Sequence, residues 1–402
     1  MNVAVLRSLN HVAPAEPVAD GRIARVEVFT DMAQAAPHWR ALKRDSSLAT
    51  PYQNFDFLHL WHRHIGAAEG VTPFIVIGFN AEGAPLFVWP FGRRRRAGLW
   101  VLEFLGGKHA NFNMGLWRRD ALTHVGEVDL RSILDGLADR ADLVMLANQP
   151  MTWAGIANPF ALLPRQYSPS FGFSGALMAD FDALYETRAS TPARRKFRRK
   201  ERMLAGHGEV RFEKVSEPDG ISAALDDFFR QKSARMRAIG LPDVFSEPGV
   251  RPFIEAAAAT PSADGGALIE LYTLSVDGVI VATIGGIVAN GRFSAMFSSI
   301  IHGQYAAESP GEQLLVQVVR HCCERGLHTF DLGIGEAHYK GLFCPDAEPM
   351  FDSYWPLSAA GRRVALLYSA VDAVKRTVKQ QPLLWSLIVK LRRLRGRLAD
   401  KG

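Results

Sequence analysis

Residues 305–315 and 330–343 decide the fold and read Y-A-A-E-S-P-G-E-Q-L-L and F-D-L-G-I-G-E-A-H-Y-K-G-L-F. The first run places S-P-G-E directly before apolar residues at helical spacing, which predicts a helix over residues 309–325. The second run predicts a short, mostly apolar strand at residues 329–332. A helix followed by a buried strand is typical of an α/β unit.

The start of the predicted helix has two interpretations. Ser309 and Glu312 have the S-x-x-E spacing of a capping box, and Pro310 suits the first turn, so the helix is explained without a ligand. Alternatively, the unpaired N–H groups of the first turn bind a pyrophosphate, which Gly311 allows to approach closely. Under this second interpretation the cofactor-binding residues include Ser309, Pro310, Gly311 and Gln313, while Glu312 partly opposes an anion.

The strand at 329–332 carries a carboxylate, Asp331, in an otherwise apolar setting. Such a residue is usually paired or catalytic. Gly335, His338, Tyr339 and Lys340 follow within reach. A structural role for Asp331, paired with Lys340 or bonded to the loop at Gly335, is as well founded as a direct role. Tyr339 with its ring in the core and Lys340 at the rim are the corresponding structural alternatives.

Composition and length indicate a globular protein of two domains, with 402 residues, 48% hydrophobic and 22% charged. The net charge of +6 is unevenly distributed, because nine of the 47 basic residues but only one of the 41 acidic residues follow residue 374. The preceding part has a net charge of −2. A domain that coats nucleic acid is therefore not indicated, and no nucleic-acid partner is expected.

Neither a disulfide framework nor a metal site is predicted. The cysteines, Cys322, Cys323 and Cys344, are too few and wrongly spaced, and they favour a reducing compartment. His62 and His64 cannot share one face of a helix. No uncharged run reaches the ~20 residues of a spanning helix. We therefore expect a cytoplasmic chain that does not cross a membrane.

Strand and helix patterns alternate along the chain, and their order in the first half recurs in the second. Asp277-Gly278 and Asn290-Gly291 are strong hairpin signals between three predicted strands. The predicted fold class is therefore α/β (α+β), with two tandem lobes, each a mixed, largely antiparallel sheet flanked by helices. We place the boundary between the lobes at residues 180 and 181.

The quoted runs resemble the acetyltransferase domain of CelD-like cellulose-biosynthesis proteins, which are FemAB-like members of the GNAT superfamily. Residues 193–206, A-R-R-K-F-R-R-K-E-R-M-L-A-G, are similar to the arginine-rich helix of that family, and residues 53–61 resemble it more weakly. The resemblance implies a GNAT-like lobe at 22–180 and a GNAT acetyltransferase lobe with the acyl-CoA site at 181–360. One departure is that S-P-G replaces the phosphate-binding Gly-x-Gly turn of ordinary GNAT enzymes.

The implied activity is transfer of an acyl group from acetyl-CoA or another acyl-CoA to an amine or hydroxyl. The implied acceptor is a small molecule or a precursor of the cell envelope or of an exopolysaccharide. FemAB relatives use aminoacyl-tRNA, so an aminoacyltransferase is an alternative. A non-catalytic GNAT-fold component of a polysaccharide-biosynthesis complex is another.

A GNAT-type site holds the acceptor against the thioester, so that no enzyme nucleophile is needed. A base and an acid then assist the transfer. Asp331 or His338 is predicted as base or acceptor anchor, Tyr339 or Tyr305 as acid, and Lys340 as the group that holds an anion of donor or acceptor.

Arg198 and Arg202 lie on one stripe of the arginine-rich helix. They either form a solvated face or bind phosphate groups, since arginine pairs bidentately with phosphate. Under the second interpretation they are substrate-binding residues, together with Gly335.

The two ends of the chain differ in character. Residues 1–21 are predicted to be a flexible tail. Residues 361–402 are predicted to contain a basic amphipathic helix, with leucines on one face and lysines and arginines on the other. This helix either docks on the body of the protein or lies on anionic lipid at the inner face of the cytoplasmic membrane.

Overall fold

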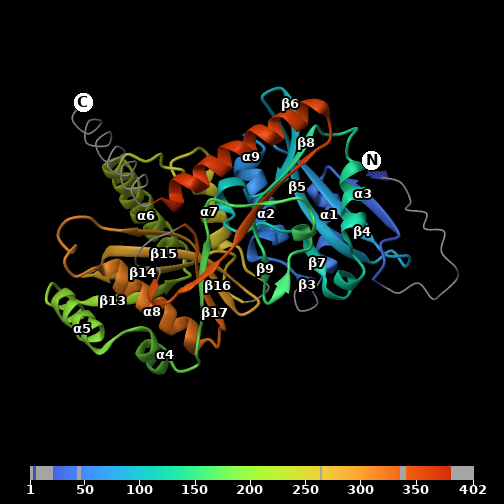
Figure 1. Cartoon of the computed structure of the whole chain (residues 1–402). Coiled ribbons are helices and arrows are strands. Elements are labelled where there is room, and N and C mark those ends of the chain that lie inside the picture. The colour runs from blue at the N-terminus through green and yellow to red at the C-terminus, as the bar shows by residue number, and fades with distance from the viewer. Residues whose placement is uncertain (1–2, 6–20, 43–46, 263–264, 336–340, 382–402) are drawn as a thin grey trace. The chain divides into compact units, whose positions relative to one another are not determined.

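The computed structural model describes residues 3–5, 21–42, 47–262, 265–335 and 341–381. The chain forms two compact units, which Figure 1 shows in rainbow colours. Unit 1 comprises Met1–Phe171 and Glu348–Thr377, and unit 2 is built around Gly172–Ala347. Each unit contains its own sheet flanked by helices. The predicted fold class is therefore confirmed.

Unit 1 is built on a mostly antiparallel sheet with one parallel step, between β6 and β8. In spatial order its main strands are β1 (Val3–Val5), β2 (Arg25–Phe29), β4 (Thr72–Phe79), β5 (Pro85–Arg96), β6 (Leu99–Phe104), β8 (Leu143–Pro150), β19 (Met350–Pro356) and β11 (Gln166–Tyr167). Its short strands are β3 (Ser47–Leu48), β7 (Leu116–Arg118), β9 (Thr152–Trp153) and β10 (Ile156–Ala157). Its α-helices are α1 (Met32–Ala41), α2 (Phe55–Trp61), α3 (Glu127–Asp135) and α9 (Ala359–Gln380). Aromatic side chains fill its interior, where the buried rings of Trp89 and Phe160 lie 5.0 Å apart.

Unit 2 has a similar plan, with a parallel step between β16 and β17. In spatial order its strands are β13 (Val210–Val215), β14 (Glu270–Val276), β15 (Val279–Ala289), β16 (Arg292–Ile300), β17 (Thr329–Ile334), β12 (Gly172–Ala176) and β18 (Asp346–Glu348). Its helices are α4 (Phe181–Arg188), α5 (Thr191–Ala205), α6 (Pro218–Ile239), α7 (Val250–Ala259) and α8 (Pro310–Glu324). Helix α6 and helix α8 pack on opposite faces of this sheet (Figure 1).

The two predicted hairpins of unit 2 are confirmed, and local backbone chemistry explains them. Both central residues of each turn have positive φ, 47° and 78° at Asp277-Gly278 and 51° and 71° at Asn290-Gly291. Aspartate, asparagine and glycine tolerate this conformation better than other residues, and it matches the twist of the flanking strands. The turns thereby set the register of β14, β15 and β16.

The structure moves the boundaries between the two lobes. Strand β12 pairs with β17 and therefore belongs to the second sheet, although it precedes the sequence-based boundary at residue 180. Strand β19 pairs with β8 and returns to the first sheet, although the sequence placed residues up to 360 in the second lobe. Strand pairing between residues more than 150 positions apart leaves no local pattern in the sequence. Helix α9 continues unit 1, and residues 382–402 lie outside the described residues.

Among the described residues, no helix is long and apolar enough to span a membrane.

A buried carboxylate connects three elements of unit 2. Glu270 on β14 accepts hydrogen bonds from Lys214 Nζ on β13 (2.6 Å), from Arg325 at the end of α8 (2.6 Å) and from the Tyr272 hydroxyl (2.7 Å). Burial raises the pKa of Glu270, but these three hydrogen bonds outweigh it and hold the pKa below its ordinary value. The ionised carboxylate therefore stabilises the folded state.

We expect Glu270→Gln to lower the free energy of unfolding by about 3 kcal/mol at pH 7, because it leaves two partly buried cations without their buried anion. The lowered pKa makes this stabilisation fully present above pH 4.5 and causes its loss as the pH falls further. Urea unfolding at pH 7 and pH 4 should thus show that the difference in free energy of unfolding between wild type and variant is smaller at pH 4. The exposed Glu213→Gln serves as control and should change stability little.

Candidate functional site

The parallel strands β16 and β17 pair over only three residues. The partners are Arg292 with Thr329, Phe293 with Phe330, and Ser294 with Asp331. Beyond Ser294, β16 continues to Ile300 and pairs, among the described residues, with β15 alone, while β17 continues to Ile334 beside β12. The two strands therefore part in the middle of the sheet.

The direction of the backbone groups on β16 follows from its pairing with β15. In an antiparallel pair, residues alternate between those whose N–H and C=O groups face the partner strand and those whose groups face away. Ile301 N–H donates to Val281 C=O at 2.8 Å, so Ile301 and Ser299 face β15. Ser298 and Ile300 consequently direct their N–H and C=O groups to the side that β17 has left. We call these two residues the open edge of β16.

An open strand edge can bind an extended ligand. A chain with amide groups can add to such an edge as a further strand, through main-chain hydrogen bonds. The pantetheine arm of CoA is an extended chain with two amides. The open edge therefore has the chemistry to hold the arm of an acyl-CoA.

Unit 1 contains the corresponding pair of parallel strands, β6 and β8. There, another segment of the chain occupies the gap beyond the paired residues. Strands β6 and β8 also pair over three residues, from Val101 with Leu143 to Glu103 with Met145. Beyond them, Asn113 N–H donates to Asn148 C=O at 2.9 Å, and the Asn113 side chain donates to Ala147 C=O at 3.1 Å. These bonds occupy the edge of β8. Unit 2 is thus the better candidate for ligand binding.

The first turn of α8 lies next to the open edge. Gly311 packs so closely on β16 that a Cβ atom on it would lie 2.6 Å from Ile300 Cγ2. Contact between helix and strand therefore requires this glycine, whether or not a ligand approaches. Glu312 and Gln313 both donate their N–H groups to Ser309 C=O, and Pro310 has no N–H group. Within the described part of the chain, Gly311 N–H is the remaining donor of the turn.

The predicted capping box at Ser309 is wrong. Ser309 has a φ of 53°, in the left-handed region, and its side chain accepts no hydrogen bond from the first turn. Instead, Lys200 Nζ on α5 donates to Ser309 Oγ at 2.9 Å and to Glu312 Oε2 at 2.6 Å. Lys200 on α5 thus binds both side chains, Ser309 and Glu312, that the capping-box motif assigned to the helix cap. Lys200 was not among the predicted site residues, because nothing in its local sequence sets it apart from its basic neighbours.

Asp331 is completely buried and already engaged. Its carboxylate accepts hydrogen bonds from Arg292 Nε at 2.6 Å, from Ser294 Oγ and from Gly333 N–H at 2.9 Å. Arg292 and Ser294 lie on β16, so Asp331 joins the two strands at the last residues that they share. These contacts favour a structural role for Asp331 over a catalytic one. The observed ion-pair partner is Arg292, whereas the sequence analysis suggested Lys340.

Tyr305 lies in a small polar cluster before α8. It is buried and contacts the ring of His207 edge-on, with 5.3 Å between the ring centroids. His207 Nε2 lies 3.5 Å from Glu308 Oε1, and the Gln313 side chain donates to Glu308 C=O at 2.9 Å. Gln313 therefore fixes the loop that carries Tyr305. Its side chain has this local partner in addition to its predicted role at the cofactor.

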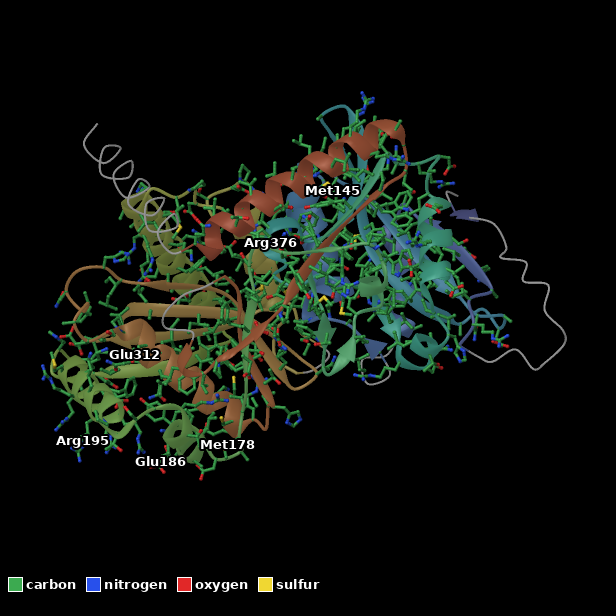
Figure 2. All side chains as sticks on the ribbon, in the orientation of Figure 1. Met145, Met178, Glu186, Arg195, Glu312 and Arg376 are labelled. Atoms are coloured by element: carbon green, nitrogen blue, oxygen red, sulfur yellow. The ribbon has the colours of Figure 1, made fainter. Side chains whose placement is uncertain are left out.

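Of the remaining predicted residues, three are described by the structure and three are not. Arg198 and Arg202 lie exposed on α5, away from its buried residues Phe197 and Leu204. Figure 2 labels Arg195 on this helix and Glu312 on α8. Gly335 ends β17 with a φ of 95°. His338, Tyr339 and Lys340 lie outside the described residues.

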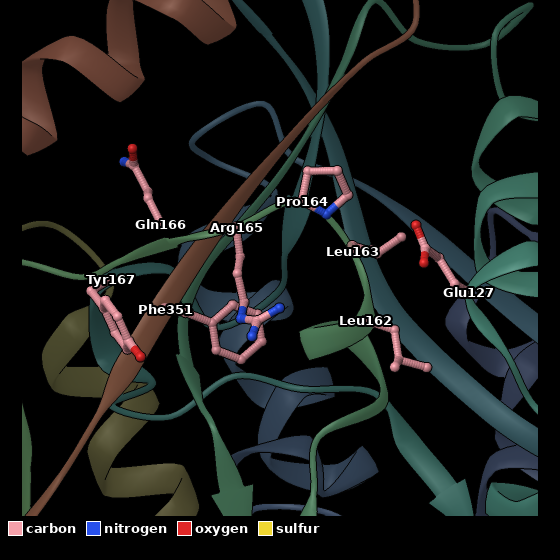
Figure 3. Close-up of a pocket in the computed structure, with 8 residues that line it drawn as sticks. All are labelled: Glu127, Leu162, Leu163, Pro164, Arg165, Gln166, Tyr167 and Phe351. Carbon is pink, nitrogen blue, oxygen red and sulfur yellow. The ribbon is translucent and has the colours of Figure 1, made fainter.

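A hollow of about 440 Å³ lies in unit 1 (Figure 3). Its lining residues are Glu127, Leu162, Leu163, Pro164, Arg165, Gln166, Tyr167 and Phe351. None of them was predicted as a site residue.

Residues 192–341 match the family model of an acetyltransferase (GNAT) domain. This range contains β16, α8 and β17, and therefore the open edge. The predicted GNAT acetyltransferase domain therefore has a family-model match over this part of the chain. The finer resemblance to CelD-like proteins stays a prediction. No curated protein matches the sequence.

Several solved structures resemble this chain at low sequence identity. The C-terminal domain of a protein assigned as a lysylphosphatidylglycerol synthetase from Agrobacterium fabrum is 14% identical, with a TM-score of 0.50, over 86% of this chain and 96% of that one. FemX is 10% identical, with a TM-score of 0.48, over 76% of this chain and 96% of that one. A tandem GNAT protein from the clavulanic acid biosynthesis pathway is 10% identical, with a TM-score of 0.45, over 83% and 99%. The first likeness shows a shared fold and says nothing of shared substrates.

We expect Asp331→Asn to act on stability. Loss of the charge leaves the partly buried Arg292 without its anion, so the free energy of unfolding should fall by about 3 kcal/mol. Chemical unfolding measures this loss, and turnover per folded molecule should stay within about twofold of wild type. A variant with wild-type stability and no turnover would instead place Asp331 in the chemistry.

Proposed function

We propose that the chain is an acyltransferase that uses acetyl-CoA or another acyl-CoA and transfers the acyl group to an amine or a hydroxyl. The open edge of β16 carries this proposal, because it offers main-chain hydrogen bonds to an extended chain of amides. The edge lies within the part of the chain that matches the GNAT acetyltransferase model. The donor arm pairs with Ser298 and Ile300.

The phosphate groups of the donor bind at the first turn of α8 in this proposal. Gly311 N–H and the positive end of the helix dipole face them, and Lys200 adds a cation. Glu312 repels an anion, but its charge is balanced by Lys200. Because Lys200 contacts the turn already, it is in place to exchange Glu312 for a phosphate oxygen.

The acceptor attacks the thioester directly. The enzyme contributes by holding the two reactants together, which needs no covalent intermediate. Cys344 supports this view, since its thiol is buried and donates to Phe330 C=O at 3.4 Å. The thiol is thus unsuited to act as a nucleophile.

The acceptor in this proposal is a small molecule or a precursor of the cell envelope or of an exopolysaccharide. The sequence resemblance to CelD-like proteins supports this class. Arg198 and Arg202 are exposed and suited to phosphate or carboxylate groups on such a molecule.

Calorimetry with acetyl-CoA, longer acyl-CoAs and CoA tests the donor. Wild type should bind acetyl-CoA, and Lys200→Met should bind it about tenfold more weakly, the effect of one lost charge-assisted contact of about 1.4 kcal/mol. Arg195→Met on the exposed side of α5 is the matched control and should bind normally. Absence of binding by wild type would refute the proposal, and binding of aminoacyl-tRNA instead would establish the FemAB-like alternative.

We also propose that residues 382–402 contact an anionic membrane surface. Six basic residues follow residue 381, each worth about 1 kcal/mol near such a surface. Removal of residues 382–402 leaves α9 intact and should abolish co-sedimentation with vesicles that contain phosphatidylglycerol. Vesicles of phosphatidylcholine alone should bind neither form, and equal sedimentation of both forms with the anionic vesicles would exclude this contact.

A further inference from the structure

Lys232 reaches the open edge from the opposite face of the sheet to α8. It lies on α6, which packs on β15 and β16. Its Nζ donates a hydrogen bond to Ser298 C=O at 3.2 Å and lies 5.1 Å from the centre of the Phe245 ring. Ser298 is one of the two open-edge residues. The amine of Lys232 thus meets β16 on the side where β17 has departed.

The neighbours of Lys232 hold its side chain in this place. The preceding residue, Gln231, is buried, donates to Ile280 C=O at 2.8 Å and accepts from Ser299 Oγ at 2.8 Å. These bonds fix α6 to both strands at the residue next to the lysine. The position of Lys232 therefore follows from the packing of the helix and not from a surface ion pair.

Burial and a neighbouring charge lower the pKa of Lys232. Burial lowers the pKa of Lys232, and the positive charge of Arg235 on the same helix lowers it further. Asp243 acts in the opposite direction, but its carboxylate also accepts hydrogen bonds from Ser233 Oγ and, at 3.1 Å, from Phe245 N–H. The pKa of Lys232 consequently lies below that of an exposed lysine, as a general base near neutral pH requires.

We propose that Lys232 is the proton acceptor of the transfer reaction, an assignment that rests on the proposed acyltransferase function. An ammonium group on the acceptor gives one proton to Lys232 Nζ, and the freed amine attacks the thioester carbonyl. The C–N bond forms and the C–S bond breaks. The second nitrogen proton goes to the leaving thiolate, which yields CoA, and Lys232 returns its proton to water. A hydroxyl acceptor gives its single proton to Lys232, which passes it to the thiolate.

Lys232 replaces Asp331 as the candidate proton acceptor. The carboxylate of Asp331 is buried among three donors and has no free path to an acceptor. Lys232 in contrast is only partly buried and lies beside the edge that is proposed to hold the donor. It is therefore better placed than Asp331 to exchange a proton with a substrate.

Labelling with trinitrobenzenesulfonate tests the amine without any ligand, because this reagent modifies neutral amines. Mass spectrometry of the peptides should show Lys232 labelled at lower pH than the exposed Lys196, and acetyl-CoA should protect Lys232 but not Lys196. Arg235→Met removes a neighbouring charge and should shift labelling of Lys232 to higher pH. Arg237→Met, exposed on the same helix, is the control and should leave the pH dependence unchanged.

Release of CoA from acetyl-CoA, with ethanolamine or water as acceptor, tests the role in the reaction. Lys232→Arg keeps a hydrogen-bond donor at this place but cannot accept a proton, so it should bind acetyl-CoA in calorimetry while release falls at least 100-fold. Wild-type rates in this variant, or equal labelling of Lys232 and Lys196 at every pH, would overturn the assignment. If wild type binds no acetyl-CoA, the proposed function fails first, and the role of Lys232 in it fails as well.

Discussion

The parting of β16 from β17 is the constraint on which the rest of unit 2 depends. A strand in the middle of a sheet normally has both edges paired, because unpaired backbone groups that are buried cost free energy. Here the pairing stops after Ser294 and Asp331, and the Asp331 carboxylate binds Arg292 and Ser294 across the last shared residues. A buried charged contact thus sets where the strands separate, and that place fixes which groups of β16 remain open.

The two units show that the same topology does not by itself make a site. Both contain a parallel step of three residue pairs. In unit 1 the side chain and backbone of Asn113 bond to β8 beyond the step, so protein atoms satisfy the edge. In unit 2 a lysine amine reaches Ser298 C=O on β16. Backbone groups that are bonded within the protein contribute to stability. An open edge next to a lysine amine can instead interact with a ligand.

The sequence predicts those features whose causes are local. Asn290-Gly291 determines a hairpin because the two residues themselves tolerate positive φ. The cap at Ser309 was wrong because its competitor, Lys200, lies 109 residues away in the chain. The partner of Asp331 was missed for the same reason, since Arg292 lies on another strand. Lys232 gave no signal at all, because a lysine on an amphipathic helix is ordinary until its contact with Ser298 is known.

Gly311 shows why the start of α8 must be judged together with the strand. Its lack of a side chain allows the helix to contact Ile300, so the glycine is required even without a ligand. That contact also brings the first turn beside the open edge, so packing alone makes the two halves of the proposed donor site neighbours. The pair between Lys200 and the partly exposed Glu312 is worth at most about 1 kcal/mol. Because a charge-assisted bond to phosphate is stronger, the proposed exchange of Glu312 for a donor phosphate would be favourable.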